Sequence, residues 1–396
     1  DLFLNILNVK YAKQEMPDNV KHIYDEEAYT KWMSYHQEHL KFSIVQNSVF
    51  TLLTLSLLLF GVFGVFESIA LDNSNSQIFQ TWIFLLMFLG IQTVVSIPFN
   101  YVHTFKIEEK YGFNKTTKKT FVIDIVKNFV LSSALFAGLV AGLQGLYIAF
   151  ESNVWLFVLL AWVFLAVVMI IMFLLSTKVF VKLFNKLTPL EEGTLKTRID
   201  ELSVKLGFEV DNISVMDASK RSSKLNAFFS GLGKSRDVVL YDTLIDKLSE
   251  DQILAVLAHE LGHATYKDTT KMLFQRIATF GIYALMIGFI MQSTKVFTDF
   301  GLQGVFFGFA LILFIILMEP VSMLIGMFTN GYSRKIEYRA DSFAKEYVGE
   351  EHMIGALEVL AKENFSNLNP HPLFVKIYYN HPTISERISS LKVEVK

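Results

Sequence analysis

Residues Ser152 to Thr177 read SNVWLFVLLAWVFLAVVMIIMFLLST and contain no Asp, Glu, Lys or Arg. The hydrocarbon core of a bilayer is about 30 Å thick, and an α-helix needs about 20 consecutive apolar residues to cross it. This segment meets that requirement and predicts a transmembrane helix.

Five more segments of similar length lack charged residues. They are Ser43 to Phe66, Ile78 to Phe105, Asn128 to Phe150, Ile277 to Thr294 and Phe300 to Met318. The segment that begins at Ile277 is the shortest, and a buried core helix is the alternative for it. The apolar run Leu2 to Val9 adds a partial span, so the sequence predicts an integral membrane protein with about seven transmembrane helices.

The composition of the 396 residues agrees with this class, because 52% are hydrophobic and only 19% are charged, against about 25% charged in soluble domains. The 36 Lys and Arg are balanced by 38 Asp and Glu, so the chain has no basic surplus with which to bind nucleic acid. It has no Cys, which leaves metal binding to His, Asp and Glu.

The loops between the spans differ in lysine content. Five lysines lie between residues 10 and 41 and five between residues 106 and 119, whereas residues 67–77 and 151–153 contain no Lys or Arg. Cytoplasmic loops accumulate positive charge. We therefore expect the N-terminus and Ser74 outside, and Lys115, residues 178–276 and the C-terminal tail on the cytoplasmic side.

The composition divides the chain into four parts. Residues 1–177 hold about five transmembrane helices, the first of them partial; residues 178–271 form an inserted α+β domain; residues 272–330 hold two more transmembrane helices; residues 331–396 form a helical tail. In the inserted domain, apolar runs at 213–216, 225–229 and 238–241 predict strands, with a turn at 231–235. Ser249 with Gln252 predicts a capping box at the start of a helix.

That helix contains the sequence His259-Glu260-Leu261-Gly262-His263. Two His residues four apart lie on one face of a helix, so both imidazoles can bind one zinc ion. Glu260 is rotated aside, where its carboxylate can serve as the general base of a metalloprotease. Because a catalytic zinc takes three protein ligands, we expect one zinc ion per chain and a third ligand from another segment.

Two carboxylates one helical turn apart follow the last span. Glu337 is a candidate for the third zinc ligand, and Asp341 can accept a hydrogen bond from the remaining ring nitrogen of a zinc-binding His.

Five further segments stand out beside these motifs. They are Glu109 to Lys115 (EKYGFNK), Phe184 to Leu190 (FNKLTPL), Ser219 to Ser223 (SKRSS), Asn226 to Phe229 (NAFF) and His381 to Thr383 (HPT). With the motifs at 259–263 and 337–341, the sequence resembles the type I CaaX prenyl proteases, which are membrane-embedded zinc metalloendopeptidases. The resemblance covers almost the whole chain.

The resemblance implies a mainly α-helical barrel of seven long helices around a water-filled chamber, with a zincin-type catalytic domain whose zinc site opens into the chamber. It implies that His259, His263 and Glu337 bind zinc and that Glu260 is the general base.

The resemblance also implies roles for two further groups of residues. Asn226, Ala227 and Phe228 look like an edge strand that pairs with the substrate backbone. His381 and Arg387 resemble the pair that stabilises the tetrahedral intermediate and braces the ligand carboxylate.

The implied activity is hydrolysis of peptide bonds near the C-terminus of a peptide or protein substrate, with or without a prenyl group, at the surface of a lipid bilayer. The chain is short for a eukaryotic member, and residues 393–396 lack the paired lysines of an ER-retrieval signal. Both features favour a bacterial plasma membrane over the ER membrane that a eukaryotic member would occupy.

Two other functions remain open. A heat-shock-type membrane zinc protease would share the catalytic residues but have about four spans. A transporter or scaffold with a structural metal site would need a closed shell of four ligands. His36 and His39 could share a second metal ion, but they lie in a polar amphipathic stretch, and a second site is not expected.

Overall fold

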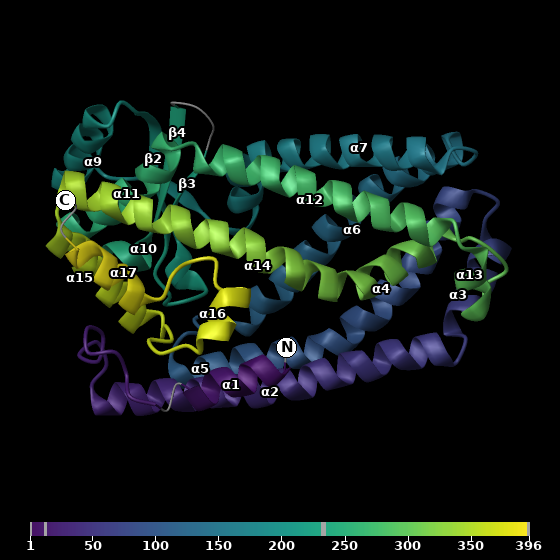
Figure 1. The fold of residues 1–396 in the computed structure, drawn as a ribbon, viewed down its shortest axis with the longest axis horizontal. Helices are drawn as coiled ribbons and strands as arrows, with labels where there is room; N and C mark the ends of the chain where they lie inside the picture. The colour runs from purple at the N-terminus through teal and green to yellow at the C-terminus, as the bar shows by residue number, and fades with distance from the viewer. Residues whose placement is uncertain (1, 12–13, 231–234, 394–396) are drawn as a thin grey trace.

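The computed structural model describes residues 2–11, 14–230 and 235–393. Long helices run side by side along the molecule, and a mixed helix and strand unit sits at the end that carries the C-terminus (Figure 1). Except for Ser235, the turn expected at 231–235 lies outside the described residues, as do residues 394–396.

Six described helices are long and apolar enough to cross a membrane. They are α2 (Glu26–Leu59), α4 (Gln77–Val102), α6 (Lys118–Ala149), α7 (Val154–Leu175), α12 (Asp268–Met291) and α14 (Phe307–Val348). Their outer faces expose large apolar side chains such as Leu52, Val94, Phe274 and Phe328. A soluble monomer rarely exposes so much apolar surface, and the chain is a multi-pass integral membrane protein.

The limits of two spans differ from the expectation. Helix α2 ends at Leu59, because Gly61 has a φ of +67° and turns the chain into α3 (Val62–Asn73). Helix α14 does not end near Met318 but continues through Pro320 and past residue 330 to Val348.

Six described helices are long enough to cross a bilayer, and the expected partial first span is the short helix α1 (Leu2–Tyr11). Helix α1 has 10 residues, which correspond to a rise of about 15 Å.

The strands form one sheet in the order β1-β2-β4-β3. They are β1 (Leu187–Pro189), β2 (Glu209–Met216), β3 (Ala227–Ser230) and β4 (Ser235–Tyr241). Strand β2 is parallel to β4, whereas β1 and β3 are antiparallel to their neighbours. The three strands expected from the sequence are present, β1 is an addition, and β3 is an edge strand.

The remaining elements connect the spans and build the unit around the sheet. They are η1 (His103–Glu108), α5 (Glu109–Tyr111), η2 (Ser176–Val181), α8 (Lys182–Phe184), α9 (Thr194–Lys205), η3 (Ala218–Lys220), α10 (Asp242–Ile245), α11 (Glu250–Thr265), α13 (Thr294–Asp299), α15 (Glu350–Glu363), α16 (Pro372–Tyr378) and α17 (Ile384–Lys392).

Helix α11 starts at the expected capping box of Ser249 and Gln252 and packs against α14. Gly262 makes the packing close: a Cβ atom placed on it would lie 3.2 Å from Phe343 and 3.3 Å from Ala340 of α14. The approach of these two helices brings residues that are more than seventy positions apart in the chain into one site.

Candidate active site

His259, His263 and Glu337 form one group of side chains between α11 and α14. The Nε2 atoms of the two His residues are 3.2 Å apart, and they lie 3.4 Å and 3.3 Å from the carboxylate oxygens of Glu337. Ligand atoms about 2.1 Å from a tetrahedral zinc ion lie about 3.4 Å from one another. The three side chains therefore match the spacing of three ligands of one metal ion.

Two buried carboxylates orient the imidazole rings. Nδ1 of His259 lies 2.8 Å from Asp341, and Nδ1 of His263 lies 3.2 Å from Asp268; both carboxylates are 1% exposed. When Nδ1–H of each His donates to its Asp, each Nε2 presents a lone pair toward Glu337. Asp341 was expected from the sequence, whereas Asp268 was not, because its only signal is its position five residues after His263.

Each of these carboxylates is paired with an arginine. Arg387 makes a bidentate contact with Asp341, at 2.8 Å from Nε and 2.5 Å from Nη2. Arg339 donates to Asp268 and lies over the ring of Tyr266 at 4.0 Å. These pairs hold the carboxylates in one orientation and neutralise their charge in a buried place.

The electrostatics of the group favour a bound cation. Two Nε2 lone pairs that face each other at 3.2 Å repel unless a positive charge lies between them. Glu337 Oε2 is buried, and although ring nitrogens lie within ion-pair distance, none of its described neighbours makes a hydrogen bond of good geometry to it. The residues present therefore fit a metal ion.

In the absence of a metal ion, a proton can take this place. Burial disfavours the charged imidazolium, but the nearby carboxylates of Asp341 and Glu337 outweigh this effect and raise the pKa of His259 to about 9. A metal ion must displace that proton at neutral pH.

Glu260 and His381 flank the group. Glu260 follows His259 on α11 and is half-buried. His381 Nδ1 lies 2.7 Å from Glu337 Oε2, and its side chain is 54% exposed. Arg387 is nearer to Asp341 than to Glu337, from which its Nη2 is 4.0 Å away. The close contact of Arg387 is therefore with Asp341, the partner of His259, and its contact with the Glu337 carboxylate is a distant one.

The expected substrate strand lies beside the catalytic helix. Strand β3 begins at Ala227, pairs with β4 along one side, and contacts α11. Asn226 precedes the strand and is exposed, whereas Ala227 is buried and Phe228 is half-buried. The backbone of Leu225 is already bonded to the side chain of Asn364, at 2.8 Å and 3.1 Å. The Asn226 carbonyl accepts from Tyr241 N–H at 3.2 Å, and Ala227 N–H donates to Asn226 Oδ1 at 2.9 Å, so a substrate that pairs here would have to replace the side-chain partner of Ala227.

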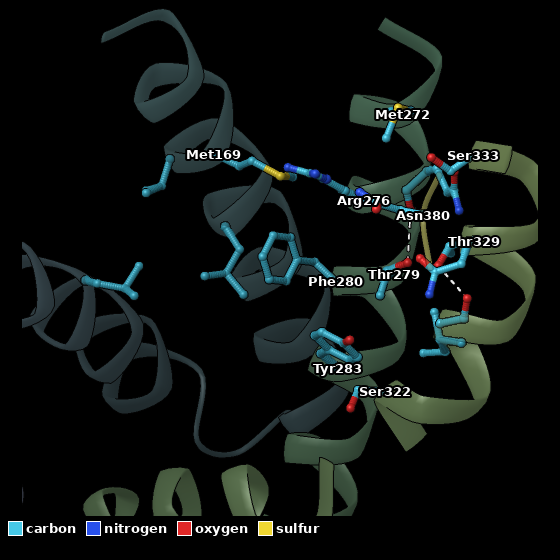
Figure 2. Close-up of a pocket in the computed structure, with 17 residues that line it drawn as sticks. Met169, Met272, Arg276, Thr279, Phe280, Tyr283, Ser322, Thr329, Ser333 and Asn380 are labelled. Atoms are coloured by element: carbon cyan, nitrogen blue, oxygen red, sulfur yellow. Dashed lines mark hydrogen bonds between the residues drawn. The ribbon is translucent and has the colours of Figure 1, made fainter. Parts of the chain in front are cut away.

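A cavity of about 600 Å³ lies between the membrane helices (Figure 2). Its walls come from α6, α7, α12 and α14, with Asn380 of the segment before α17. Ser333 lines it one helical turn before Glu337, and Asn380 precedes His381. The lining of the cavity therefore comes within one helical turn of Glu337 and within one residue of His381 in the chain.

Comparison with known proteins identifies the family. A family model described as peptidase family M48 matches residues 189–395, and one described as the CAAX prenyl protease N-terminal region with five membrane helices matches residues 5–186. The chain belongs to peptidase family M48. With its expected fold confirmed, this M48 peptidase is a membrane metallopeptidase of the CaaX protease type.

Its relatives match over nearly their full length. The CAAX prenyl protease 1 homolog of Arabidopsis thaliana is 33% identical over 96% of this chain and 91% of its own, and CAAX prenyl protease 1 of Saccharomyces cerevisiae is 31% identical over 96% and 89%. The crystal structure of S. mikatae Ste24p superimposes with a TM-score of 0.92 at 29% identity, covering 99% of this chain and 95% of that one.

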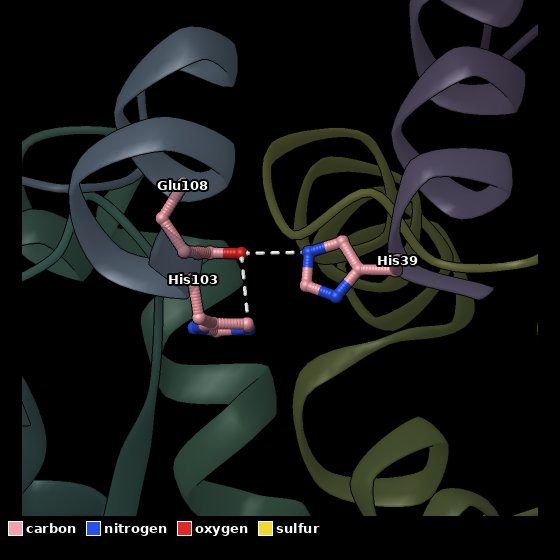
Figure 3. A group of neighbouring side chains, drawn as sticks. All are labelled: His39, His103 and Glu108. Atoms are coloured by element: carbon pink, nitrogen blue, oxygen red, sulfur yellow. Dashed lines mark hydrogen bonds and ion pairs between the residues drawn. The ribbon is translucent and has the colours of Figure 1, made fainter. Parts of the chain in front are cut away.

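A second cluster of metal-ligating residue types lies away from the site in this M48 peptidase (Figure 3). Glu108 lies 3.0 Å from Nε2 of His39 and 4.0 Å from Nε2 of His103. It also accepts a hydrogen bond from Tyr35 at 2.7 Å and lies 4.0 Å from Lys224. The π-helical turn η1 places His103 and Glu108 on one face.

The sequence analysis considered His39 only together with His36, and the structure separates the two. His36 Nε2 lies 3.1 Å from the carbonyl oxygen of Phe365. Glu108 also contacts a tyrosine hydroxyl and a lysine, so its polar contacts connect α2, η1 and the segment before β3.

Proposed function

We propose that this M48 peptidase is a zinc-dependent endopeptidase that cuts near the C-terminus of prenylated proteins. The observation that carries the proposal is the group of His259, His263 and Glu337, whose ligand atoms are 3.2–3.4 Å apart, with Glu260 next to it. The names of the relatives supply the substrate class.

In this proposal one zinc ion per chain is held by His259, His263 and Glu337. When bound, zinc polarises the scissile carbonyl and lowers the pKa of the attacking water. Glu260 takes the proton from that water and delivers it to the leaving amine.

His381 is the proposed hydrogen-bond donor to the oxyanion. Its ring contacts Glu337, and its 54% exposure leaves it accessible to a substrate. Arg387 acts through Asp341, whose carboxylate sets the ring orientation of His259.

The substrate backbone is proposed to pair with the free edge of β3 at Asn226, Ala227 and Phe228. An edge strand offers unpaired N–H and C=O groups to an extended peptide and accepts varied side chains. Residues 178–271 and the tail 331–396 would together form the catalytic unit, while residues 1–177 and 272–330 would hold it in the membrane.

In the proposed orientation, the lysine-rich loops and the catalytic unit lie on the cytoplasmic side and the lysine-free loops lie outside. The reason is that cytoplasmic loops accumulate positive charge. The proposed location is a bacterial plasma membrane, with the ER membrane as the alternative in a eukaryotic cell.

The other two candidate functions receive no support. Six helices able to cross a membrane exceed the four or so of a heat-shock-type protease. A closed structural site needs four ligands, and the group found among the described residues supplies three.

Purified protein tests the proposal through metal content and hydrolysis together. We expect one zinc ion per chain and cleavage of a farnesylated peptide, and we expect Glu260→Gln to keep the zinc and lose about 10³-fold or more in rate. Glu346→Gln, a change of an exposed Glu on α14, is the matched control. Normal turnover by Glu260→Gln would exclude Glu260 as the base.

A further inference from the structure

The cavity between the membrane helices contains one charged side chain that nothing in the catalytic mechanism uses. Arg276 lies in the third turn of α12, and its side chain points across the cavity toward Met169 of α7 (Figure 2). None of the other described lining residues is Asp, Glu, Lys or Arg. Within the described part of the chain, Arg276 has neither an ion-pair nor a hydrogen-bond partner.

Arg276 is exposed and lines the cavity, so its guanidinium group is available to an anionic ligand that enters it. Residues after Arg276 form the apolar part of α12, and ionisable residues that line cavities between membrane helices usually pair or serve function. The planar guanidinium group matches a carboxylate with two parallel hydrogen bonds.

The separation along α12 between the start of this helix, beside the metal-ligand group, and Arg276 follows from helix geometry. Asp268, the hydrogen-bond partner of His263, begins α12, and Arg276 is eight residues further along the same helix. Eight residues correspond to a rise of about 12 Å.

This distance fits a short chain end. In a CaaX sequence the lipid-bearing Cys is followed by three residues and the C-terminus. With the cut after that Cys, the three released residues span about 10 Å when extended. A substrate with its scissile bond at the metal-ligand group would place its terminal carboxylate near Arg276.

The walls of the cavity suit the residues in between. Apolar side chains of α7 and α12 line the cavity and would pack against aliphatic side chains of the substrate. They include Val168, Met169, Met272 and Phe280. Ser333 and Asn380 add polar atoms on the side of the cavity that leads to the metal-ligand group.

We propose that Arg276 binds the α-carboxylate of the substrate's C-terminus, so that this peptidase measures the distance from the cut to the chain end. This inference rests on the proposed function, since it uses a substrate cut three residues from its end.

The test compares two peptides that differ only at the C-terminus. Both carry a fluorescent label and an S-farnesyl cysteine followed by Val-Leu-Ala, and one ends in a carboxylate, the other in a carboxamide. Binding is measured by anisotropy to zinc-loaded Glu260→Gln protein, which cannot consume the peptides, in phosphatidylcholine nanodiscs that contain no anionic lipid.

A hydrogen-bonded charge pair contributes about 1.5–3 kcal/mol, so the acid should bind about 10- to 100-fold more tightly than the amide. Arg276→Gln in the same background should remove this preference and leave the affinity for the amide unchanged. Arg198→Gln, the same substitution at a site on α9 that pairs with Asp251, should keep the preference.

Equal binding of the two peptides by the Arg276 protein, absence of binding by both, or a preference that survives Arg276→Gln would each overturn the inference. Hydrolysis by the protein with Glu260 intact is measured separately. A carboxylate preference without any hydrolysis would refute the proposed function and leave the carboxylate site standing.

Discussion

Oδ2 of Asp268 lies 3.2 Å from Nδ1 of His263, and its carboxylate is 1% exposed. Asp341 stands in the same relation to His259, at 2.8 Å. Each proposed zinc-binding His is therefore held by a buried carboxylate that is itself held by an arginine. Both rings point Nε2 at one place, toward Glu337.

Loss of either carboxylate should weaken zinc binding. Asp268→Asn and Asp341→Asn keep the shape of the side chain but offer a weaker acceptor to Nδ1–H, and we expect each to lower zinc affinity by about 10- to 100-fold. Competition with a chelator of known affinity measures this. Asp72→Asn, an exposed position on α3, is the control, and unchanged affinity in both variants would contradict an orienting role.

Zinc affinity should depend on pH in a defined window. Because the pKa of His259 in the metal-free protein is about 9, zinc must displace a proton below that pH. The apparent affinity should rise about tenfold per pH unit from pH 7 and level off near pH 9. Isothermal titration at several pH values measures this slope. In Asp341→Asn, which removes a partner that raises this pKa, levelling off should begin at a lower pH; a flat profile in the parent would disprove the proton displacement.

Substitutions of His381 and of Arg387 should impair the enzyme in different ways. His381→Ala should lower kcat by about 10²- to 10³-fold with little change in zinc affinity, as the loss of an oxyanion donor does. Arg387→Ala should weaken zinc retention by about 10- to 100-fold, because Asp341 loses its partner. Kinetics and metal analysis of both variants separate these effects, with His22→Ala, an exposed position, as the control. Near-normal rate and zinc content in both would show that neither residue acts in the site.

The cluster around Glu108 should contribute stability rather than bind a second zinc ion. Glu108→Gln keeps the shape but loses the charge that His39 and Lys224 face, and we expect about 1–2 kcal/mol lower unfolding free energy. Zinc content should remain one per chain. Metal analysis with denaturant unfolding checks both values, and a parent protein with two zinc ions that loses one in Glu108→Gln would show a second site.

Membrane orientation can be tested with single cysteines in this Cys-free chain. A Cys in place of Ser74 should react with an impermeant thiol reagent in intact cells. A Cys in place of Lys115 should react only after permeabilisation. The opposite pattern would reverse the proposed orientation.

Much of this protein was evident from local sequence patterns. Charge-free runs located all six long helices, because the length of such a run is set by the thickness of the bilayer and needs no knowledge of neighbours. The spacing of His259 and His263 placed both on one helix face, because four residues make about one turn. The capping box at Ser249 marked the start of that helix for an equally local reason.

Other features depended on contacts between distant segments. Gly61 ends α2 inside an apolar run, and α14 continues from the membrane to Glu337 and Asp341. Hydrophobicity alone predicts neither the end of α2 nor the continuation of α14. Asp268 gained its role because Arg339, from another helix, neutralises it in a buried place. Arg276 faces a cavity that exists only once α7, α12 and α14 are packed together. Local sequence patterns predicted the properties of single helices. The orientation of the metal-ligand group and the cavity between the membrane helices depend on close packing between helices, such as that of Gly262 against Phe343, and no local pattern encodes such packing.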